Sequence, residues 1–235
     1  MRLLLEALAE LLFPARCLGC GRQLGCSRPP LLCTSCSTGI APLSEPICPY
    51  CGTPGANRSC PSCLQHSFAF DRARSLFIYQ EPIRSLIHDL KFSGSLAGLN
   101  TFAALAQQAT LADLLHEPDL ILPVPLHIRR LRWRGFNQSL LLAQVCFPAW
   151  RKKIQPDLLQ RHRATVPQTQ LDAVLRRSNL HGAFSLSAPE LVQGRNVLLV
   201  DDVFTTGSTL DECAKVLREA GAAEIAAFTL AKTVK

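Results

Sequence analysis

The sequence predicts an α/β fold, a parallel β-sheet with helices on both faces, preceded by a small cysteine-rich module. Apolar runs of strand length alternate with helical patterns from residue 69 onward, which is typical of a parallel sheet covered by helices. Nine of the eleven cysteines lie before His66. A chain of 235 residues has room for one medium-sized domain and a small one.

The first thirteen residues are predicted to form an amphipathic helix. The segment Leu3–Phe13 is apolar but contains Glu6 and Glu10, and it has no small-residue cleavage site, so it does not resemble a signal peptide. It is also too short to span a bilayer. We therefore expect a cytoplasmic protein without a membrane span, in which thiols stay reduced.

Residues 14–66 contain four C-x-x-C pairs: Cys17/Cys20, Cys33/Cys36, Cys48/Cys51 and Cys60/Cys63. Two such turns together supply four thiolates for a tetrahedral Zn²⁺ site, and four protein ligands leave no open position for catalysis. Pairing in chain order gives two structural zinc sites and a double zinc ribbon. Crossed pairing fits the spacing equally well. The other cysteines, Cys26, Cys146 and Cys213, are interpreted as bystanders.

Residues 67–235 are predicted to form the α/β domain, element by element. Strand patterns cover Ala69–Tyr79, Leu120–Leu126, the segment from Asn196, and Ala226–Ala231. Helical patterns cover Pro82–Phe92, Leu99–Leu115, Leu140–Cys146 and the segment after Thr209. The order of these patterns is that of a parallel sheet with crossover helices.

The segment Val197–Thr209 predicts a phosphate-binding site. Four apolar residues precede Asp201 and Asp202, which are expected at the end of the strand; a small-residue loop follows: Thr205, Thr206, Gly207, Ser208 and Thr209. α/β sheets bind ligands where a strand opens through such a loop into a helix, and the N–H groups there favour phosphate. Thr209 and Glu212 fit a capping box at the start of that helix.

Positive charge is concentrated in the middle of the chain. The formal net charge is +7, and residues 121–180 contain eleven Lys or Arg against two acids. Such an excess suits a polyanion, either pyrophosphate or nucleic acid, although a solvated basic face is the plain alternative. Trp133 and Phe136, within this region, are interpreted as packing residues rather than as a platform for stacked bases.

The segment Val197–Thr209 resembles the phosphoribosyl-pyrophosphate (PRPP) signature of type I phosphoribosyltransferases. The resemblance implies that the loop Thr205–Thr209 holds the ribose 5-phosphate. It also implies that Asp201 and Asp202 act at the catalytic centre by holding the ribose 2- and 3-hydroxyls. Mg²⁺ would be bound together with PRPP.

A longer set of motifs resembles the ComF family. In order, these are Val124-Pro125-Leu126, Arg134-Gly-Phe-Asn-Gln-Ser139, Arg163-Ala-Thr165-x-x-Gln168 with Arg176-x-x-Asn179, and the PRPP signature. The match also includes the pair Lys91-Phe92, earlier in the chain. ComF proteins couple a double zinc ribbon to a phosphoribosyltransferase-like domain and are associated with bacterial DNA uptake and competence; a gluconate-named branch shares the layout. The resemblance implies that Pro125 and Leu126 line a pyrophosphate loop. Arg163 and Thr165 would contact PRPP from a flexible loop over Arg161–Gln168.

Two functions remain open on the sequence alone. The first is a phosphoribosyltransferase, a glycosyltransferase acting on PRPP, involved in DNA uptake and natural transformation. The second is a non-catalytic protein that binds PRPP or single-stranded DNA with a retained phosphoribosyltransferase fold. In either case the zinc ribbon is a candidate contact for other DNA-uptake proteins. No binding region for an acceptor substrate is identifiable.

Overall fold

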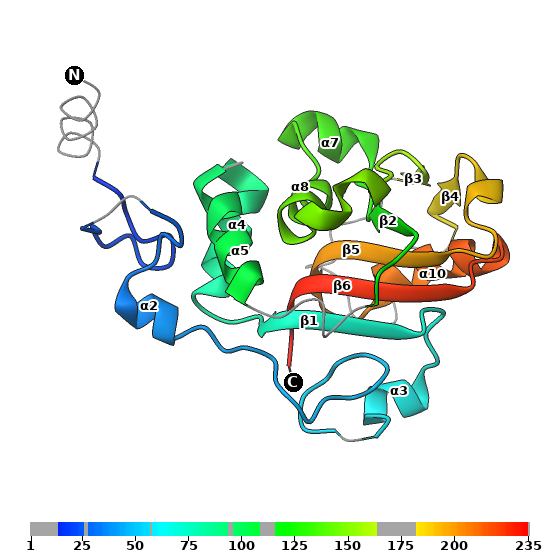
Figure 1. The fold of residues 1–235 in the computed structure, drawn as a ribbon, viewed down its shortest axis with the longest axis horizontal. Helices are drawn as coiled ribbons and strands as arrows, with labels where there is room; N and C mark the ends of the chain where they lie inside the picture. The colour runs from blue at the N-terminus through cyan, green and yellow to red at the C-terminus, as the bar shows by residue number, and fades with distance from the viewer. Residues whose placement is uncertain are drawn as a thin grey trace.

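A computed structural model describes residues 14–25, 28–56, 58–93, 96–108, 116–163 and 182–234. Its centre is a four-stranded sheet with the order β1-β6-β5-β2, in which every pairing is parallel (Figure 1). The strands are β1 (Arg72–Ile78), β2 (Leu120–Pro123), β5 (Asn196–Phe204) and β6 (Glu224–Lys232). The predicted parallel α/β fold is confirmed. The predicted helix over residues 1–13, together with Cys26 and Thr165, lies outside the described residues.

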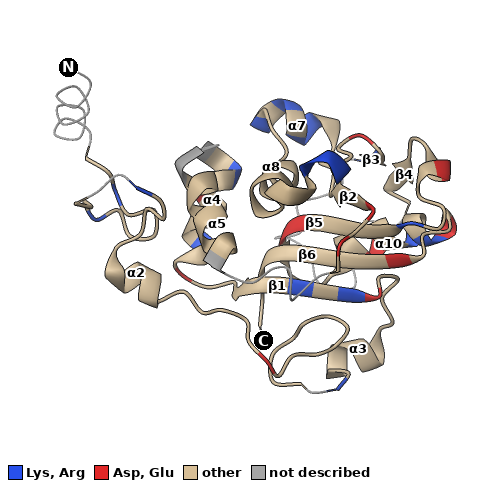
Figure 2. Cartoon of the chain, in the orientation of Figure 1, with Lys and Arg blue, Asp and Glu red and all other residues tan. Residues whose placement is uncertain are grey.

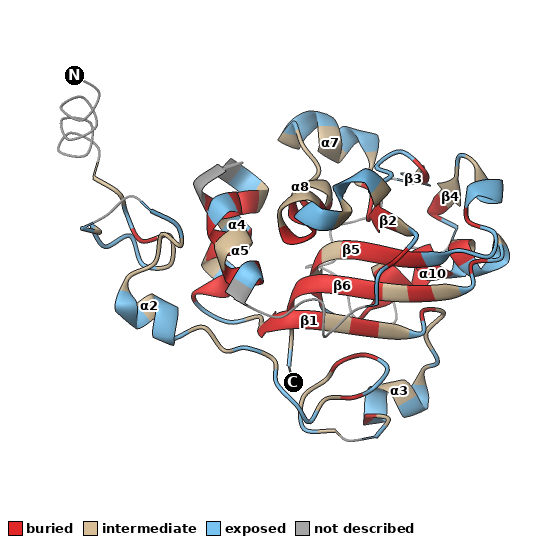
Figure 3. Ribbon diagram, in the orientation of Figure 1, coloured by how far each residue is buried: buried red, intermediate tan, exposed pale blue. Residues whose placement is uncertain are grey.

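Helices cover both faces of the sheet, which explains the continuous apolar run in β5. Val197 and Leu199 pack on the face covered by α10 (Ser208–Glu219). Leu198 and Val200 pack on the opposite face, which is covered by α4 (Ile83–Ser93), α5 (Leu96–Gln108) and α8 (Gln138–Cys146). A strand buried on both sides needs apolar residues at every position rather than at alternate ones. Figure 3 shows the resulting buried core of β5 and β6.

Two details of the signature segment differ from expectation. Asp201 and Asp202 lie inside β5 rather than at its end, because pairing with β6 continues as far as Phe204 and Lys232. The predicted capping box is wrong. α10 begins at Ser208, after Gly207 with φ 78°, so Thr209 is already helical.

A small antiparallel pair, β3 (Leu159–Arg161) and β4 (Phe184–Leu186), lies beside the main sheet. It joins the two chain segments that flank residues 164–181. Two short connecting helices, η1 (Pro148–Lys153) and η3 (Pro189–Leu191), and the basic helix α7 (Ile128–Arg134) complete the domain. In the described parts of the chain, no helix is long and apolar enough to cross a membrane.

The eight paired cysteines form two clusters that combine in chain order: Cys17/Cys20/Cys33/Cys36 and Cys48/Cys51/Cys60/Cys63. Within each cluster the sulfurs lie within 4.8 Å of one another. The Sγ–Sγ distances are 3.7 Å for Cys20–Cys33 and 3.5 Å for Cys51–Cys60. A tetrahedron with Zn–S bonds of about 2.3 Å requires about 3.8 Å between sulfurs. Both clusters therefore fit a structural zinc ion.

Backbone hydrogen bonds favour the thiolate form of the first cysteine in each cluster. Burial raises the pKa of the Cys17 thiol, but backbone N–H groups of Cys33, Cys20 and Gly19 outweigh it and lower the pKa to about 6. The pKa of Cys48 is lowered to about 6 by the same balance of burial against backbone hydrogen bonds. Thiolate is the form that ligates zinc.

The second cluster is part of the core of the α/β domain. Cys48, Cys51 and Cys60 pack with Phe70 and Ala73 on the α10 face of the sheet. The N–H of Ala73, in β1, donates to the Tyr50 carbonyl at 2.6 Å. By contrast, Cys20 in the first cluster is exposed, and that ribbon reaches α5 through a 3.1 Å bond from the Leu31 N–H to Thr101 Oγ1.

Wild-type protein should carry two zinc ions per chain, and Cys20→Ser and Cys60→Ser should each lose one. Cys60→Ser should also lower the Tm of the α/β domain by about 5–10 °C more than Cys20→Ser, because it disrupts a cluster inside the core; this corresponds to roughly 2–3 kcal/mol. Metal analysis and calorimetry of protein kept reduced would measure both effects. Equal Tm values in the two variants, or fewer than two zinc ions in the wild type, would contradict this assignment.

Candidate functional site

A cavity of about 610 Å³ opens at the carboxyl ends of β2 and β5. Its walls come from α4, the β2–α7 segment, α7, α8, β3, and the β5–α10 loop. This is the edge at which parallel α/β sheets bind ligands. Of the predicted PRPP-binding residues, the lining includes Pro125, Leu126, Thr205, Gly207, Ser208 and Thr209, and both predicted acids line it as well.

Asp201 and Asp202 are held by partners from two different helices. Asp201 Oδ1 accepts hydrogen bonds from Ser139 Oγ, in α8, and from the Asp202 N–H, both at 2.9 Å. Asp202 is buried, and its Oδ2 lies 2.6 Å from Lys91 Nζ at the end of α4. The two carboxylates therefore meet the cavity in fixed orientations.

The environment of Asp201 disfavours its ionised form. Burial is the largest cause, and the neighbouring charge of Asp202 acts in the same direction. Hydrogen bonds from the Asp202 N–H and Ser139, together with the charge of Lys91, oppose them. The result is a pKa raised to about 7, so a proton on Asp201 is exchangeable near neutral pH.

The turn before α10 has the geometry of a phosphate loop. Gly207 adopts φ 78°, and a Cβ at this position would lie 2.7 Å from Phe204 Cζ and 2.9 Å from Phe68 Cε1. Only glycine fits this position. Thr206 Oγ1 and Ser208 Oγ lie 2.8 Å apart, so the two hydroxyls brace the turn. The Ser208 N–H lies 3.4 Å from Thr206 Oγ1, and a helix N-terminus that begins at such a turn favours an anion.

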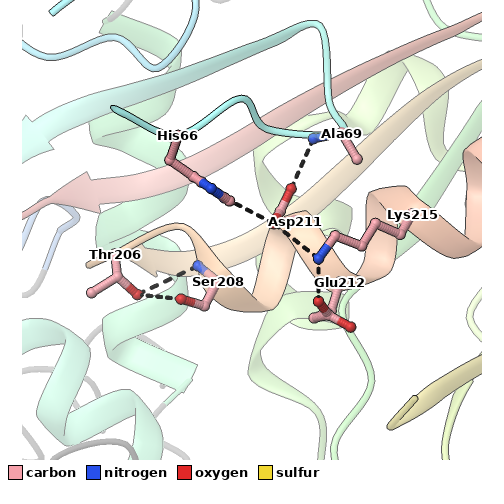
Figure 4. Close-up of polar contacts among 7 residues, drawn as sticks. All are labelled: His66, Ala69, Thr206, Ser208, Asp211, Glu212 and Lys215. Carbon is pink, nitrogen blue, oxygen red and sulfur yellow. Dashed lines mark hydrogen bonds and ion pairs between the residues drawn. The ribbon is translucent and has the colours of Figure 1, made fainter. Parts of the chain in front are cut away.

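A buried carboxylate, Asp211, fixes α10 against the segment that leaves the second cysteine cluster (Figure 4). Asp211 Oδ1 accepts the Ala69 N–H at 2.8 Å, and Oδ2 lies 3.1 Å from His66 Nε2. Lys215, one turn further along α10, adds its ammonium at 3.4 Å. The helix that carries the phosphate loop is thus held in place by the ribbon's exit segment.

Lys232 interacts both with the second cysteine cluster, through charge, and with Phe204, the aromatic residue next to the phosphate loop. It is buried, and its Nζ lies 3.4 Å from the centre of the Phe204 ring. Burial lowers the pKa of Lys232, while the sulfurs of Cys48, Cys51, Cys60 and Cys63 act against that shift. A cationic Lys232 suits a cluster in which four thiolates would surround one Zn²⁺ and leave a net negative charge.

Four cations line the cavity: Lys91, Arg130, Arg134 and Arg161. Arg134 Nη1 donates to Gln138 Oε1 at 2.6 Å, across the start of α8. Burial lowers the pKa of Arg134 and of Arg161, which marks both guanidinium groups as partly desolvated. Planar guanidinium groups with this placement suit the paired oxygens of a pyrophosphate.

The arginine of the predicted flexible loop that lines the cavity is not the one that was predicted. Arg163 is exposed and is not among the described residues that line the cavity, whereas Arg161, two residues earlier in β3, is. Thr165 lies outside the described residues. The sequence motifs gave no role to Lys91, Ser139 or Arg161; their only signal was position, in the Lys91-Phe92 pair, the Arg134–Ser139 motif and the predicted loop.

The prediction for Trp133 is also wrong. This residue was predicted to be a packing residue, but 69% of it is exposed, and it lines the cavity. Phe136, two residues beyond α7, packs against the core, as expected. Trp133 lies in α7, in which no residue is buried, whereas Phe136 follows the left-handed turn at Gly135 that ends the helix.

The donor set at the cavity fits Mg²⁺ bound together with a phosphorylated sugar. Carboxylate oxygens are ligands that Mg²⁺ prefers, and Mg²⁺ retains waters when it binds through one or two carboxylates and substrate phosphates. Here two carboxylates face the cavity, and the Lys91 ammonium group forms an ion pair with Asp202. Asp201 and Asp202 are the residues that would hold the ion.

Comparisons with known proteins place these features in a family. Residues 150–234 match a family model described as a phosphoribosyl transferase domain, and residues 8–65 match one described as a double zinc ribbon domain. The chain is 38% identical to DNA utilization protein YhgH of Escherichia coli O157:H7, over 86% of this chain and 91% of that protein. It is 36% identical to Competence protein F of Haemophilus influenzae, over 94% and 98%.

Two more distant matches were also found. Competence protein ComFC of Bacillus subtilis is 27% identical over 86% of this chain and 84% of that protein. Among solved structures, the glutamine PRPP amidotransferase from B. subtilis matches with a TM-score of 0.35 and 22% identity, covering 60% of this chain and 30% of that one. With both domain models in order and relatives of this identity along most of their length, the chain belongs to the ComF family of double-zinc-ribbon phosphoribosyltransferase-domain proteins.

Proposed function

We propose that this ComF-family protein binds PRPP with Mg²⁺ in the cavity at the end of β5 and acts in the handling of incoming DNA. The observation that carries the proposal is the convergence of two carboxylates, a phosphate loop and four cations on one cavity. In this scheme the loop Thr205–Thr209 holds the 5-phosphate, and Asp201 and Asp202 accept hydrogen bonds from the ribose hydroxyls. We place the protein in the cytoplasm, where its cysteines stay reduced.

The same residues support transfer chemistry at ribose C1. Loss of pyrophosphate builds negative charge on the leaving group, and Arg134 and Arg161 are placed to neutralise it. Magnesium bound with PRPP supplies further neutralisation of that charge. Asp201 and Asp202 hold the ribose while positive charge develops on its ring, and their own charge stabilises that state.

The link to DNA rests on the relatives and on charge. All three of the relatives reported above are named for DNA utilization or competence. Lys and Arg gather on α7 above the sheet (Figure 2), where Arg129, Arg130, Arg132 and Arg134 occur without an acid. A cationic helix beside a phosphate-binding cleft also suits the second candidate function, a non-catalytic protein that holds PRPP or single-stranded DNA. Assaying pyrophosphate release from PRPP with Mg²⁺, with and without single-stranded DNA, separates the two functions.

Replacing Asp201 and Asp202 together by Asn should weaken Mg²⁺-dependent PRPP binding about 100-fold or more, since a hydrogen bond to a charged group is worth roughly 1.5–3 kcal/mol. Asn preserves size, so the fold should survive. Calorimetric titration measures the affinity, with Asp157→Asn, an exposed acid outside the cavity, as the matched control. Unchanged affinity in the folded double variant would refute the role in holding the ribose.

The carboxyl group of Asp201 should titrate near pH 7 in the PRPP-free protein, and Asp202→Asn should lower that pKa by removing the neighbouring negative charge. Carbon-13 NMR of the aspartate carboxyl groups follows both titrations. Because the folded pKa lies above the ordinary aspartate value of 3.8, the contribution of Asp201 to stability is full below pH 3.8 and is lost as the pH rises to about 7. Titration of Asp201 near its ordinary pKa would contradict this environment.

If α7 binds the backbone of single-stranded DNA, replacing Arg129 and Arg132, which do not line the cavity, by Ala should flatten the dependence of log affinity on log salt by roughly 1.4 units, at about 0.7 per lost phosphate contact. PRPP affinity should change much less. Fluorescence anisotropy over a salt series measures the slope. Arg151→Ala/Lys152→Ala, which removes two exposed charges on η1, should leave it unchanged. No binding at low salt would remove the nucleic-acid part of the proposal.

A further inference from the structure

We propose that three rings at the mouth of the cavity bind an unpaired nucleobase, so that the cleft has a base-binding subsite beside its phosphate loop. The rings are His88 and Phe92 of α4 and Trp133 of α7; together we call them the aromatic step. This inference rests on the proposed function, because it deepens the ligand preference of the same cleft. It assigns a role to side chains that the phosphate loop and the acidic pair leave unexplained.

The aromatic step is exposed and lines the cavity. Phe92 is 59% exposed and Trp133 is 69% exposed, and His88 is also exposed. The His88 and Phe92 ring centroids lie 4.5 Å apart, and the Phe92 and Trp133 rings meet edge to face at 6.0 Å. All three residues line the cavity that contains Asp201 and Asp202. Large rings normally enter a core, so a cluster left in solvent at a binding cavity marks a ligand surface.

Phe92 and Trp133, from the two helices of the aromatic step, each lie next to a residue that links them to Asp201 or Asp202. Phe92 follows Lys91, whose ammonium lies 2.6 Å from Asp202 Oδ2. Trp133 precedes Arg134, which donates to Gln138 at the start of α8, the helix whose Ser139 holds Asp201. The rings therefore keep a defined position relative to the ribose and phosphate site, as a base subsite requires.

The charge around the step fits a nucleic-acid strand. The Arg134 guanidinium lies 5.9 Å from the centre of the Phe92 ring, and Arg130 also lines the cavity. Arg129 and Arg132 are exposed on the same helix as Trp133. Aromatic rings that stack bases, interleaved with cations that contact phosphates, are how proteins bind single strands without reading sequence. A purely apolar partner would not need these arginines, and an acidic partner without bases would not need the exposed rings.

The test compares a short oligodeoxythymidine strand with an abasic strand of equal phosphate number, both bound to zinc-loaded full-length protein at one salt concentration. The base-bearing strand should bind about 10-fold tighter, the order expected for one stacked base. Phe92→Leu/Trp133→Leu should abolish that difference without changing the affinity for the abasic strand. Tyr50→Leu, which alters an aromatic residue 51% exposed on the second ribbon, should preserve it. Equal binding of the two strands by the wild type would overturn the proposal.

A second measurement observes the step directly. The chain has two tryptophans, and Trp150 stacks on Phe147 at 5.5 Å in the core, so Trp150→Phe leaves Trp133 as the reporter. Its emission should be quenched by the oligonucleotide, but not by PRPP or by the abasic strand. Quenching by thymidine monophosphate as well would extend the subsite to free nucleotides. Absence of quenching by both base-bearing ligands would overturn it.

The outcomes separate this proposal from the function on which it rests. Salt-dependent binding of both strands without a base effect would leave DNA binding standing and remove the aromatic step. Base-dependent quenching without detectable PRPP binding would support the step and remove the PRPP assignment.

Discussion

The pair of carboxylates on β5, with Asp202 buried and Asp201 half-buried, is the constraint around which the cleft is built. Burial of an unpaired charge costs several kcal/mol, so two adjacent acids inside a covered sheet require partners. Ser139 and Lys91 supply them at 2.9 and 2.6 Å. The contact with Ser139 fixes the start of α8, beside Arg134. The contact with Lys91 fixes the end of α4, beside Phe92. The group proposed to recognise ribose thereby also positions the cations and rings around it.

A second buried carboxylate explains why the cysteine-rich head and the α/β domain form one structure. Asp211 receives the Ala69 N–H and faces His66, and both belong to the segment that follows the last paired cysteine. Phe204 lies next to the phosphate loop, between Gly207 and Lys232. The second ribbon therefore acts as a structural support for the phosphate loop, whereas the first ribbon leaves Cys20 exposed.

Local patterns in the sequence predicted the features that depend on neighbouring residues. Cysteine spacing predicted the two clusters, and the apolar run followed by two acids and a small-residue loop predicted the cleft. The contacts that complete the site join residues 62 and 145 positions apart, as in Ser139–Asp201 and His66–Asp211, and no periodicity reveals such pairs. The capping box failed because the left-handed turn at Gly207 starts the helix before Thr209. The exposure of Trp133 depends on how far α7 extends from the domain, which its composition does not encode.

The most direct test of the account is a crystal structure of the zinc-loaded protein with PRPP and Mg²⁺. The account predicts the 5-phosphate at the N–H groups of the loop Thr205–Thr209, the ribose hydroxyls at Asp201 and Asp202, and the pyrophosphate toward Arg134 and Arg161. Density for PRPP elsewhere on the protein, or a cavity that stays empty at saturating PRPP and Mg²⁺, would contradict it.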